Sequence, residues 1–451
     1  MSEGGIKRTA SPTRPISPPP LRRKVESSIN KKAAANFFTP ASQKKPEPIK
    51  WRILGTSLII GKYTPENYTQ DLSEKDRKIA AFDLDSTLIK TKSGNTFPRS
   101  ATDWQWWNTV VPGKLRELKS DGFQVVVFSN QKKIAIQKDI KAGSGESKSL
   151  ATFKEKLTAM MNELQVPISV YAATTDAEYR KPRLGMWKEF QDDYDLDVTG
   201  IDMKKSFFVG DAGGRPGDHS AADLGFASNA GLKYNTPEEF FLGQAPGQTN
   251  DTFNPKSYME MDLNGPVVKF TRKHPLELVI FCGSPGAGKS SYYWNNLEPL
   301  GYERVNQDIL KTVSPTSSTR DQPPDTSQRP KCLKVARELL EAKKSVVVDN
   351  TNANIETREY WTSLAKELNV PIRCVQFIST SELCKHNNAV RASNKELNPE
   401  SRTSLPGIAF GDFGRRFQEP TLGEGFEDII PVKFQFVGNE EARKLWGQFW
   451  I

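Results

Sequence analysis

No run of apolar residues in this sequence approaches the length of a membrane span, and the N-terminus lacks the apolar core of a secretory signal. Cysteine is also scarce: the 451 residues contain four, with no CxxC pair and no spacing typical of a metal site. Scattered cysteines of this kind are expected to be reduced thiols. These absences predict a soluble protein that stays inside the cell and does not bind a membrane.

Apolar residues make up 36% of the chain, which is low and indicates that part of it does not fold. Residues 1–50 carry eleven Lys or Arg against three Glu, so most of the net charge of +9 lies there. We expect a disordered basic tail over these residues, with clusters typical of nuclear targeting and of weak attraction to nucleic acid. A solvated linker without either role is the alternative. The paired Phe37 and Phe38 are a candidate anchor for a repair-protein partner.

From Trp51 onward, continuous apolar runs alternate with amphipathic helical stretches. KIAAFDL, FQVVVFSN, ISVYAAT and KSFFVGD form one series of expected strands, and LELVIFCG, SVVVDNTN and IRCVQFIS form a second. This alternation predicts two doubly wound α/β domains with parallel sheets. A polar stretch rich in Gly, Pro and Asn separates the two series. The expected organisation is therefore a tail over 1–50, a domain over 51–245, a junction over 246–275 and a domain over 276–451.

Two acids, Asp83 and Asp85, end the first apolar strand in the stretch IAAFDLDSTLIK. Ser129 and Asp211 also stand at the ends of expected strands. The carboxyl ends of parallel strands meet at one edge of a sheet, which is where ligands bind. Acids brought together in this way need a cation, and Mg²⁺ suits carboxylates, water and phosphate oxygens.

The motifs DLDST, SNQ, RKP and GDAGGRPGDHSAAD resemble those of the haloacid dehalogenase superfamily of phosphatases. The resemblance implies that Asp83 is the nucleophile that forms an aspartyl-phosphate. Asp85 would protonate the leaving oxygen and later deprotonate the attacking water, which is a general acid and base role. Ser129 would bind a phosphoryl oxygen, and Lys181 would offset the charge of Asp83 and the phosphate.

The same resemblance implies that Asp211 holds Mg²⁺ together with Asp83 and the backbone carbonyl of Asp85. One of Asp218 and Asp223 is expected to be a further ligand or a neighbouring acid, and the other a surface or helix-capping residue. We favour Asp223 for the metal because it opens the helical stretch ADLGFASNAG.

In the second series, GSPGAGKS fits G-x-x-x-x-G-K-[ST], follows the strand LVIFC and precedes an expected helix. Backbone amides of such a loop cradle phosphates at a helix N-terminus. Lys289 would reach the β- and γ-phosphates of ATP, and Ser290 would bind Mg²⁺. The expected ATP-binding residues are Gly283, Ser284, Pro285, Gly286, Ala287, Gly288, Lys289, Ser290 and Ser291.

Four further residues complete the expected kinase site. Asp308, in VNQDILK, follows a short strand and is a candidate general base, with an N-cap as the alternative. Asp349 ends the strand in SVVVDNTN and is suited to contact Mg²⁺ through water or to orient the loop. Asn387 and Arg391 lie four residues apart on one helical face, with His386 nearby. Arg391 would close over the transferring phosphate, unless it is one more arginine on a solvated helix.

Both motif sets together, with SGNTFPRSATDWQWW, HNNAVR and FQEPTLGEGFEDI, resemble the polynucleotide kinase 3′-phosphatases over about residues 51–437. The resemblance implies a nuclear DNA end-healing enzyme that removes 3′-phosphates and phosphorylates 5′-hydroxyls with ATP. An RNA-repair enzyme with the same chemistry is the alternative. The chain departs from the animal enzymes because residues 1–50 are too few for a forkhead-associated domain, which makes it fungal-type. It also has Ser86 where many relatives have glycine.

Contacts with DNA are expected to be local, because the charge outside the tail is nearly balanced. Trp104, Trp106, Trp107, Phe410 and Phe413 would either stack on unpaired bases or, as we favour, pack in the core. Arg415 and Arg416 are candidates for phosphate contacts. The sequence leaves the oligomeric state open, with a monomer as the working expectation.

Overall fold

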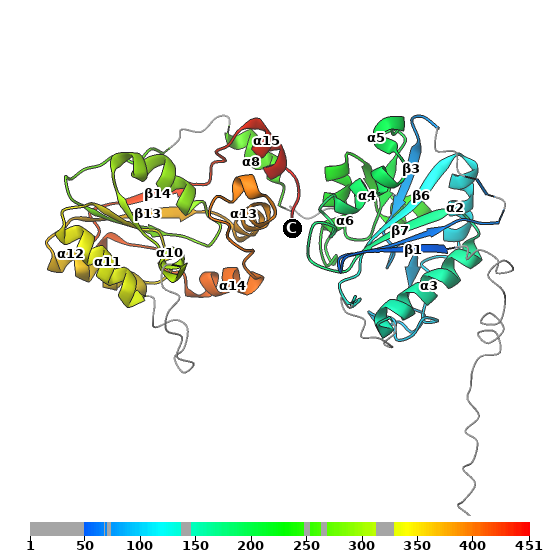
Figure 1. The fold of residues 1–451 in the computed structure, drawn as a ribbon, viewed down its shortest axis with the longest axis horizontal. Coiled ribbons are helices and arrows are strands. Elements are labelled where there is room, and N and C mark those ends of the chain that lie inside the picture. The colour runs from blue at the N-terminus through cyan, green and yellow to red at the C-terminus, as the bar shows by residue number, and fades with distance from the viewer. Residues whose placement is uncertain are drawn as a thin grey trace, which may run out of the picture. The chain divides into compact units, whose positions relative to one another are not determined.

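The computed structural model describes residues 49–66, 68–69, 74–136, 146–247, 253–262, 268–312 and 329–451. All of the expected basic tail except its last two positions, including Phe37 and Phe38, lies outside these residues. Among the described residues, no helix combines the length and the apolarity that a bilayer crossing demands. The described residues form two α/β domains (Figure 1).

The first domain is built on a seven-stranded sheet with the order β1-β2-β7-β6-β3-β8-β9. Its five strands from β7 to β9 are mutually parallel, as predicted, whereas β2 runs antiparallel to both β1 and β7. The sheet is therefore mixed rather than wholly parallel. The strands are β1 (Ile49–Leu54), β2 (Leu58–Tyr63), β3 (Lys78–Phe82), β6 (Phe123–Asn130), β7 (Ile168–Ala173), β8 (Phe207–Val209) and β9 (Lys233–Asn235), with a separate ribbon of β4 (Ile89–Lys90) and β5 (Gln105–Trp106).

Helices cover both faces of this sheet. Successive residues of a strand face opposite sides, so Ala80 and Phe82 of β3 enter one apolar core while Ile79 and Ala81 enter another. The helices α2 and α3 pack in the first core and α4 and α6 in the second, on opposite sides of the sheet (Figure 1). The helices are α2 (Val111–Ser120), α3 (Lys148–Leu164), α4 (Gly185–Asp193), α5 (Leu196–Thr199), α6 (Ala222–Ala230) and α7 (Pro237–Leu242).

The second domain has a five-stranded, fully parallel sheet with the order β11-β12-β10-β13-β14. The central strand β10 alternates between two cores in the same way: Leu278 and Ile280 face one side, and Val279 and Phe281 face the other. The strands are β10 (Leu278–Cys282), β11 (Glu303–Val305), β12 (Val346–Val348), β13 (Ile372–Ile378) and β14 (Ile429–Lys433).

The helices of the second domain include α8, which lies within the stretch expected as a junction. Phe253, Tyr258 and Met259, in or next to α8, pack against a small cluster that contains Trp446. The helices are α8 (Pro255–Asp262), α9 (Lys289–Tyr292), α10 (Gln307–Thr312), α11 (Arg329–Glu341), α12 (Ile355–Glu367), α13 (Ser381–Ser393), α14 (Gly407–Arg416) and α15 (Glu440–Trp446), with a π-helical turn η2 (Tyr293–Leu297) and short 3₁₀ turns η3 (Glu298–Leu300), η4 (Lys395–Leu397) and η5 (Leu422–Glu424).

Candidate active sites

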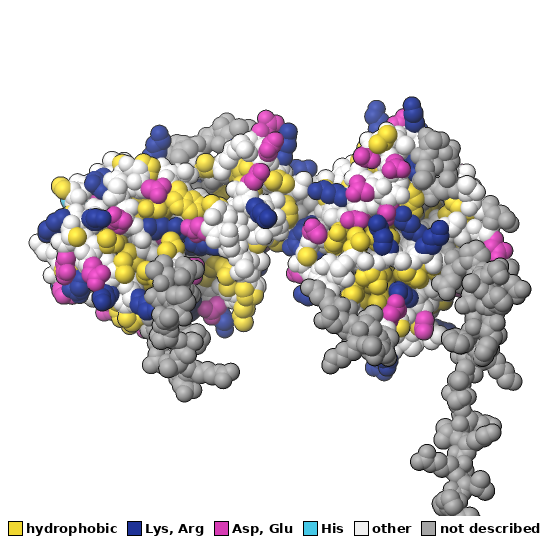
Figure 2. Space-filling view, in the orientation of Figure 1, with side chains coloured by type: hydrophobic (Ala, Val, Ile, Leu, Met, Phe, Trp, Pro, Cys, Tyr) yellow, Lys and Arg dark blue, Asp and Glu magenta, His cyan; other side chains and the backbone are white. Residues whose placement is uncertain are grey.

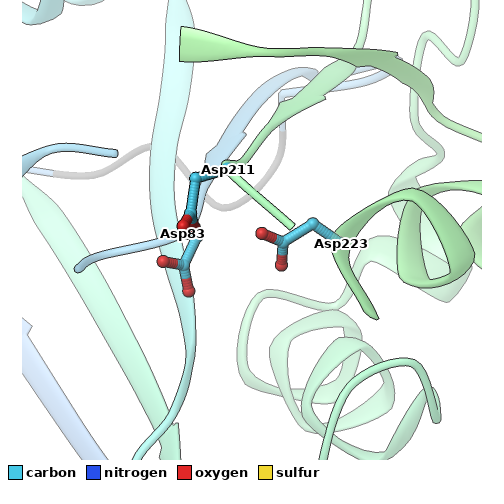
Figure 3. A group of neighbouring side chains, drawn as sticks. All are labelled: Asp83, Asp211 and Asp223. Carbon is cyan, nitrogen blue, oxygen red and sulfur yellow. The ribbon is translucent and has the colours of Figure 1, made fainter. Parts of the chain in front are cut away.

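Three carboxylates meet at the carboxyl edge of the first sheet. Asp83 follows β3 and Asp211 follows β8, and these two strands are paired in parallel, so their ends lie side by side. Asp223, in the first turn of α6, completes the cluster, and one oxygen from each carboxylate lies within 4.8 Å of the others. Figure 3 shows the three side chains turned toward a shared space.

Local backbone contacts explain why Asp223 joins the cluster and Asp218 does not. The Oδ2 of Asp223 accepts a hydrogen bond from the amide of Ala212 (3.0 Å). A Cβ on Gly210 would stand 2.4 Å from that oxygen, so only glycine fits there. Asp218 instead accepts bonds from the amide and Nε of Arg215 (3.0 and 3.1 Å), which lower its pKa although burial opposes this, and it orders the loop.

Lys181 is the cation of this cluster. Its Nζ lies 2.5 Å from Oδ1 of Asp83 and 2.7 Å from Oδ1 of Asp223, and its side chain is 2% exposed. Burial raises the pKa of Asp83 well above its usual value, with Lys181 opposing and the neighbouring carboxylates adding to the rise. Burial, then the charge of Asp223, raises the pKa of Asp211 to about 6.

One ammonium group does not balance three carboxylates, of which Asp83 and Asp223 are buried and Asp211 is partly buried. The donor set consists of hard carboxylate oxygens on rigid elements, which is the chemistry that Mg²⁺ requires. The residues therefore fit the expected metal, with Asp83, Asp211 and Asp223 as side-chain ligands. The side chain of Asp85 lies outside this cluster, which leaves its backbone carbonyl as its expected metal contact.

Asp85 belongs to a second group of polar side chains. Ser129, near the end of β6, is buried, and Gln131 donates from Nε2 to its Oγ (2.9 Å) and to Oδ2 of Asp85 (2.5 Å). Lys156 on α3 places its Nζ 3.3 Å from Oδ1 of Asp85. The expected acid–base residue and the expected phosphoryl-binding residue are thus linked through Gln131.

Sequence reasoning did not single out Gln131 or Lys156. Gln131 stands in the SNQ motif, whose side chains other than Ser129 received no role. Lys156 carries a weak signal, a lysine on the apolar face of a helix between Phe153 and Met160. Ser86, where glycine was noted in relatives, has φ +61°, which is the left-handed region that glycine adopts most readily.

The second site is built on the loop between β10 and α9. Gly286 and Gly288 have φ +76° and +89°, and a Cβ on Gly286 would stand 2.3 Å from the carbonyl oxygen of Cys384. These two positions need glycine for backbone conformation and, at Gly286, for space. The motif therefore adopts the strand–loop–helix context predicted for it.

Lys289, the first residue of α9, turns back over its own loop. Its Nζ donates to the carbonyl oxygens of Gly283 (2.9 Å) and Ser284 (2.7 Å). Burial lowers its pKa, while the charge of Asp349 opposes this. The ammonium group is thus held within the loop that would bind phosphates.

Asp349 follows β12 and is buried. Its Oδ2 accepts hydrogen bonds from Oγ of Ser290 (2.8 Å) and from Nε of Arg304 (2.8 Å). Arg304 also donates from Nη2 to Oγ of Ser290 (2.8 Å). The two expected Mg²⁺-binding groups of this site therefore lie together, next to an arginine on β11 that sequence reasoning missed.

Asp308 stands in the first turn of α10, and its side chain is 61% exposed. The N-cap role belongs to Asn306, whose Oδ1 accepts from the amides of Asp308 (2.8 Å) and Ile309 (3.3 Å). Arg402 lies 3.7 Å away, between its Nη1 and Oδ2 of Asp308. The capping alternative for Asp308 is therefore not supported.

Asn387 and Arg391 on α13 line the same cavity, as their spacing predicted. Asn387 donates from Nδ2 to the carbonyl of Gly286 (2.8 Å) and accepts from Nε1 of Trp446 (2.7 Å), so it holds the phosphate loop. Arg391 donates from Nη2 to Asn388 (3.3 Å). Burial, then the charge of Arg402, lowers the pKa of Arg391.

His386 was expected near this site, but it belongs to the core. It is fully buried, and its Nε2 donates to the carbonyl oxygen of Trp446 (2.9 Å). Its ring packs against those of Phe253 and Trp446. Burial lowers its pKa to about 4, so it is a neutral structural residue.

The cavity of the second site has a volume of about 1180 Å³. It is lined by the phosphate loop, Asp308, Asp349, Arg391 and Arg402. This volume exceeds that of most small-ligand pockets. The cavity therefore has room for a nucleoside triphosphate and for part of a second substrate beside Asp308.

The expected nucleic-acid contacts fall into two groups. Trp104, Trp106 and Trp107 pack against the first core while partly buried, and Phe410 is buried in the second domain. Phe413 is partly buried and pairs with Phe417, whereas Arg415 and Arg416 are exposed and paired with Asp412. On the face that Figure 2 shows, basic and acidic side chains are interspersed on both domains.

Comparisons with known proteins match both domains. A family model described as polynucleotide kinase 3 phosphatase matches residues 78–241, and one described as AAA domain matches residues 278–420. The bifunctional polynucleotide phosphatase/kinase of Schizosaccharomyces pombe is 41% identical over 394 residues, which cover 87% of this chain and 86% of that protein. A putative bifunctional polynucleotide phosphatase/kinase of Acanthamoeba polyphaga mimivirus is 30% identical, covering 80% and 85%. A polynucleotide 3′-phosphatase of Saccharomyces cerevisiae is 29% identical, covering 40% of this chain and 95% of that protein.

Proposed function

The chain belongs to the bifunctional polynucleotide phosphatase/kinase family, and we propose that it heals the ends of broken DNA strands. The first domain hydrolyses 3′-phosphates and the second phosphorylates 5′-hydroxyls with ATP. The products, a 3′-hydroxyl and a 5′-phosphate, are the termini that a ligase joins. The observation that supports this proposal is that one chain holds two separate groups of side chains: the cluster of Asp83, Asp211 and Asp223 with Lys181, and the phosphate loop that shares a cavity with Asp308.

In the proposed phosphatase reaction, a carboxylate oxygen of Asp83 attacks the phosphorus and the bond to the 3′-oxygen breaks. Asp85 gives its proton to that oxygen and then takes one from the water that attacks the aspartyl-phosphate. Ser129 donates to a phosphoryl oxygen, and Lys181 offsets negative charge at Asp83. Mg²⁺, when bound by Asp83, Asp211, Asp223 and the Asp85 carbonyl, offsets the charge that the phosphate adds.

In the proposed kinase reaction, Asp308 takes the proton of the 5′-hydroxyl, whose oxygen attacks the γ-phosphorus of ATP. The bond between that phosphorus and the β–γ bridging oxygen breaks, and ADP leaves. The loop amides and Lys289 hold the β- and γ-phosphates, and Arg391 meets the transferring group. Asn387 keeps the loop in place through the carbonyl of Gly286. Ser290 and Asp349 would hold Mg²⁺, which offsets phosphate charge when bound.

We further propose that the protein acts in the nucleus as a monomer and that the basic residues 1–50 steer it toward DNA or a repair partner. The basic clusters of that segment support nuclear targeting. The mixed charge of the face that Figure 2 shows supports a basic DNA path that is local rather than spread over that face.

The proposal is tested by offering the full-length protein, with ATP and Mg²⁺, nicked duplexes that carry a 3′-phosphate and a 5′-hydroxyl. Matched duplexes with RNA strands at the nick run in parallel. We expect both DNA termini to be converted, with the RNA termini converted at least ten times more slowly. Conversion of RNA alone would replace DNA repair by RNA repair, and conversion of neither end would refute the proposal.

A further inference from the structure

Lys156 has an unusual position for a lysine. It lies on the face of α3 that packs against the first sheet, among Phe153, Leu157 and Met160, and its side chain is 5% exposed. Lysine is rarely buried unless its charge is paired, because the ammonium group loses its hydration. An apolar residue would fill this position of the helix at lower cost. The ammonium group of Lys156 therefore needs a partner whose interaction offsets the free-energy cost of its burial.

That partner is Asp85. The Nζ of Lys156 lies 3.3 Å from Oδ1 of Asp85, whose side chain is 50% exposed. Many lysines bury only their aliphatic stem and extend the ammonium group into water. Lys156 is instead buried along its whole side chain, and its ammonium group is paired with Asp85. Here the lysine side chain is held in the core, and the carboxylate that its ammonium group meets is half-exposed.

The second oxygen of Asp85 is held as well. Gln131 donates from Nε2 to Oδ2 of Asp85 (2.5 Å), and the same nitrogen donates to Oγ of Ser129 (2.9 Å). Neither an ammonium group nor an amide N–H accepts a hydrogen bond, so these contacts select a carboxylate that accepts on both oxygens. Lys156 and Gln131 thus fix the positions of both oxygens of Asp85, and both contacts suit the carboxylate that remains after Asp85 has given its proton away.

We propose that Lys156 is a positioning residue that acts through Asp85 on the second half of the phosphatase reaction; this rests on the proposed function. After giving its proton to the 3′-oxygen, Asp85, held at both oxygens, takes a proton from the water whose oxygen attacks the phosphorus of the aspartyl-phosphate. The bond between phosphorus and the Asp83 oxygen breaks, and inorganic phosphate leaves. The first half-reaction needs the protonated form of Asp85, so Lys156 assists it less.

The two half-reactions are separable in one experiment on the full-length protein. An oligonucleotide with a ³²P-labelled 3′-phosphate is mixed with excess enzyme and Mg²⁺, and samples are quenched in acid over the first turnover. Release of the 3′-hydroxyl oligonucleotide reports the first step, release of labelled phosphate reports the second, and acid-stable label on the protein reports the aspartyl-phosphate.

For Lys156→Met we expect the first step to stay within about threefold of the wild type. Release of phosphate should slow about 10- to 100-fold, which is part of what a general base contributes, and label should accumulate on the protein. Lys156→Arg, which keeps a cationic donor, should restore most of the phosphate release. Lys154→Met is the matched control, because Lys154 lies on the same helix and pairs with Glu146 instead of Asp85.

Phosphorylation of 5′-hydroxyl ends by the same preparations reports whether each variant is folded. Equal slowing of both steps in Lys156→Met, or no slowing of either, would overturn the inference while the wild type still removes 3′-phosphates. A wild type that releases no phosphate from these ends would instead refute the proposed function itself.

Discussion

At the scale of single residues, the first site holds more negative charge than its lysine balances. Burial, then the charge of Asp223, raises the pKa of Asp211 to about 6 from its ordinary value of 3.8. The folded protein thus binds this proton more tightly than the unfolded chain does. Without metal, the contribution of Asp211 to folding stability is fully present below about pH 4 and is lost as the pH rises through about 6.

Protons and Mg²⁺ therefore compete for this cluster. We expect Mg²⁺ to raise the melting temperature clearly at pH 7.5 and little at pH 5, where Asp211 is protonated. Thermal unfolding with and without Mg²⁺ at the two pH values measures this difference. Asp211→Asn should remove most of the Mg²⁺-dependent rise in melting temperature at pH 7.5. An equal rise at pH 5 and pH 7.5 in the wild type would contradict the metal site, as would a rise in this variant equal to that of the wild type.

Asp308 is the proposed general base and Asn306 is the N-cap of α10, two roles that the local sequence does not distinguish. Asp308→Ala should lower kcat for 5′-phosphorylation by about 10²- to 10⁴-fold, the contribution typical of a general base. The free energy of unfolding of the Asp308→Ala variant should differ from that of the wild type by less than about 0.5 kcal/mol, because the Asp308 side chain is mostly exposed.

Asn306→Ala is the matched control, since Asn306 caps α10. It should cost about 1 kcal/mol of stability, the usual cost of losing an N-cap. Chemical denaturation and steady-state kinetics of both variants test this assignment. A strongly destabilised and still active Asp308→Ala would show that Asp308 is structural.

Single residues also show which parts of the candidate site could be predicted from the sequence alone and which could not. Asp83 and Asp211 could be placed because strand ends converge at one sheet edge whatever the details of packing. Asp223, in the first turn of α6, was only favoured over Asp218. The role of Lys156 could not be predicted, because it depends on how α3 docks on the sheet. The buried position of His386 could not be predicted for a related reason: helical spacing fixes the face on which a residue lies, but not that its ring packs against Trp446.

At the scale of elements, the phosphate loop depends on α13 as much as on its own sequence. Gly286→Ala would drive a Cβ into the carbonyl of Cys384, 2.3 Å away, at φ +76°. We expect loss of ATP binding and of kinase activity, with 3′-phosphatase activity unchanged. Binding of a fluorescent ATP analogue and the two activity assays measure this.

Gly411→Ala is the control for this prediction. Gly411 lies within α14, and a Cβ there would meet no atom within 4 Å. It should keep kinase activity and gain about 0.5–1 kcal/mol of stability, because alanine favours a helix over glycine. Normal ATP binding by Gly286→Ala would show that the loop moves away from α13.

The elements themselves were predictable where their pattern is local. The buried strands β3, β6 and β10 are short apolar runs, and each forms where the sequence predicted it. The pairing of β2 with β7 was not foreseen, because it joins segments about 110 residues apart and depends on no local pattern. Because β2 runs antiparallel to both β7 and β1, the first sheet is mixed rather than wholly parallel.

At the scale of the whole molecule, two chemistries that cancel each other on one small metabolite become complementary on the two ends of a broken strand. Each domain has its own sheet and its own cores, and each holds its own group of expected site residues. We therefore expect the two activities to be chemically independent within one chain.

The most direct test compares wild type, Asp83→Ala and Lys289→Ala on nicked DNA with a 3′-phosphate and a 5′-hydroxyl, with both termini read out and a ligase added. We expect Asp83→Ala to phosphorylate the 5′ end only and Lys289→Ala to free the 3′ end only. Neither variant should permit sealing alone, whereas a mixture of the two should restore it. Loss of both activities in either variant, despite normal folding, would contradict the claim of two independent sites.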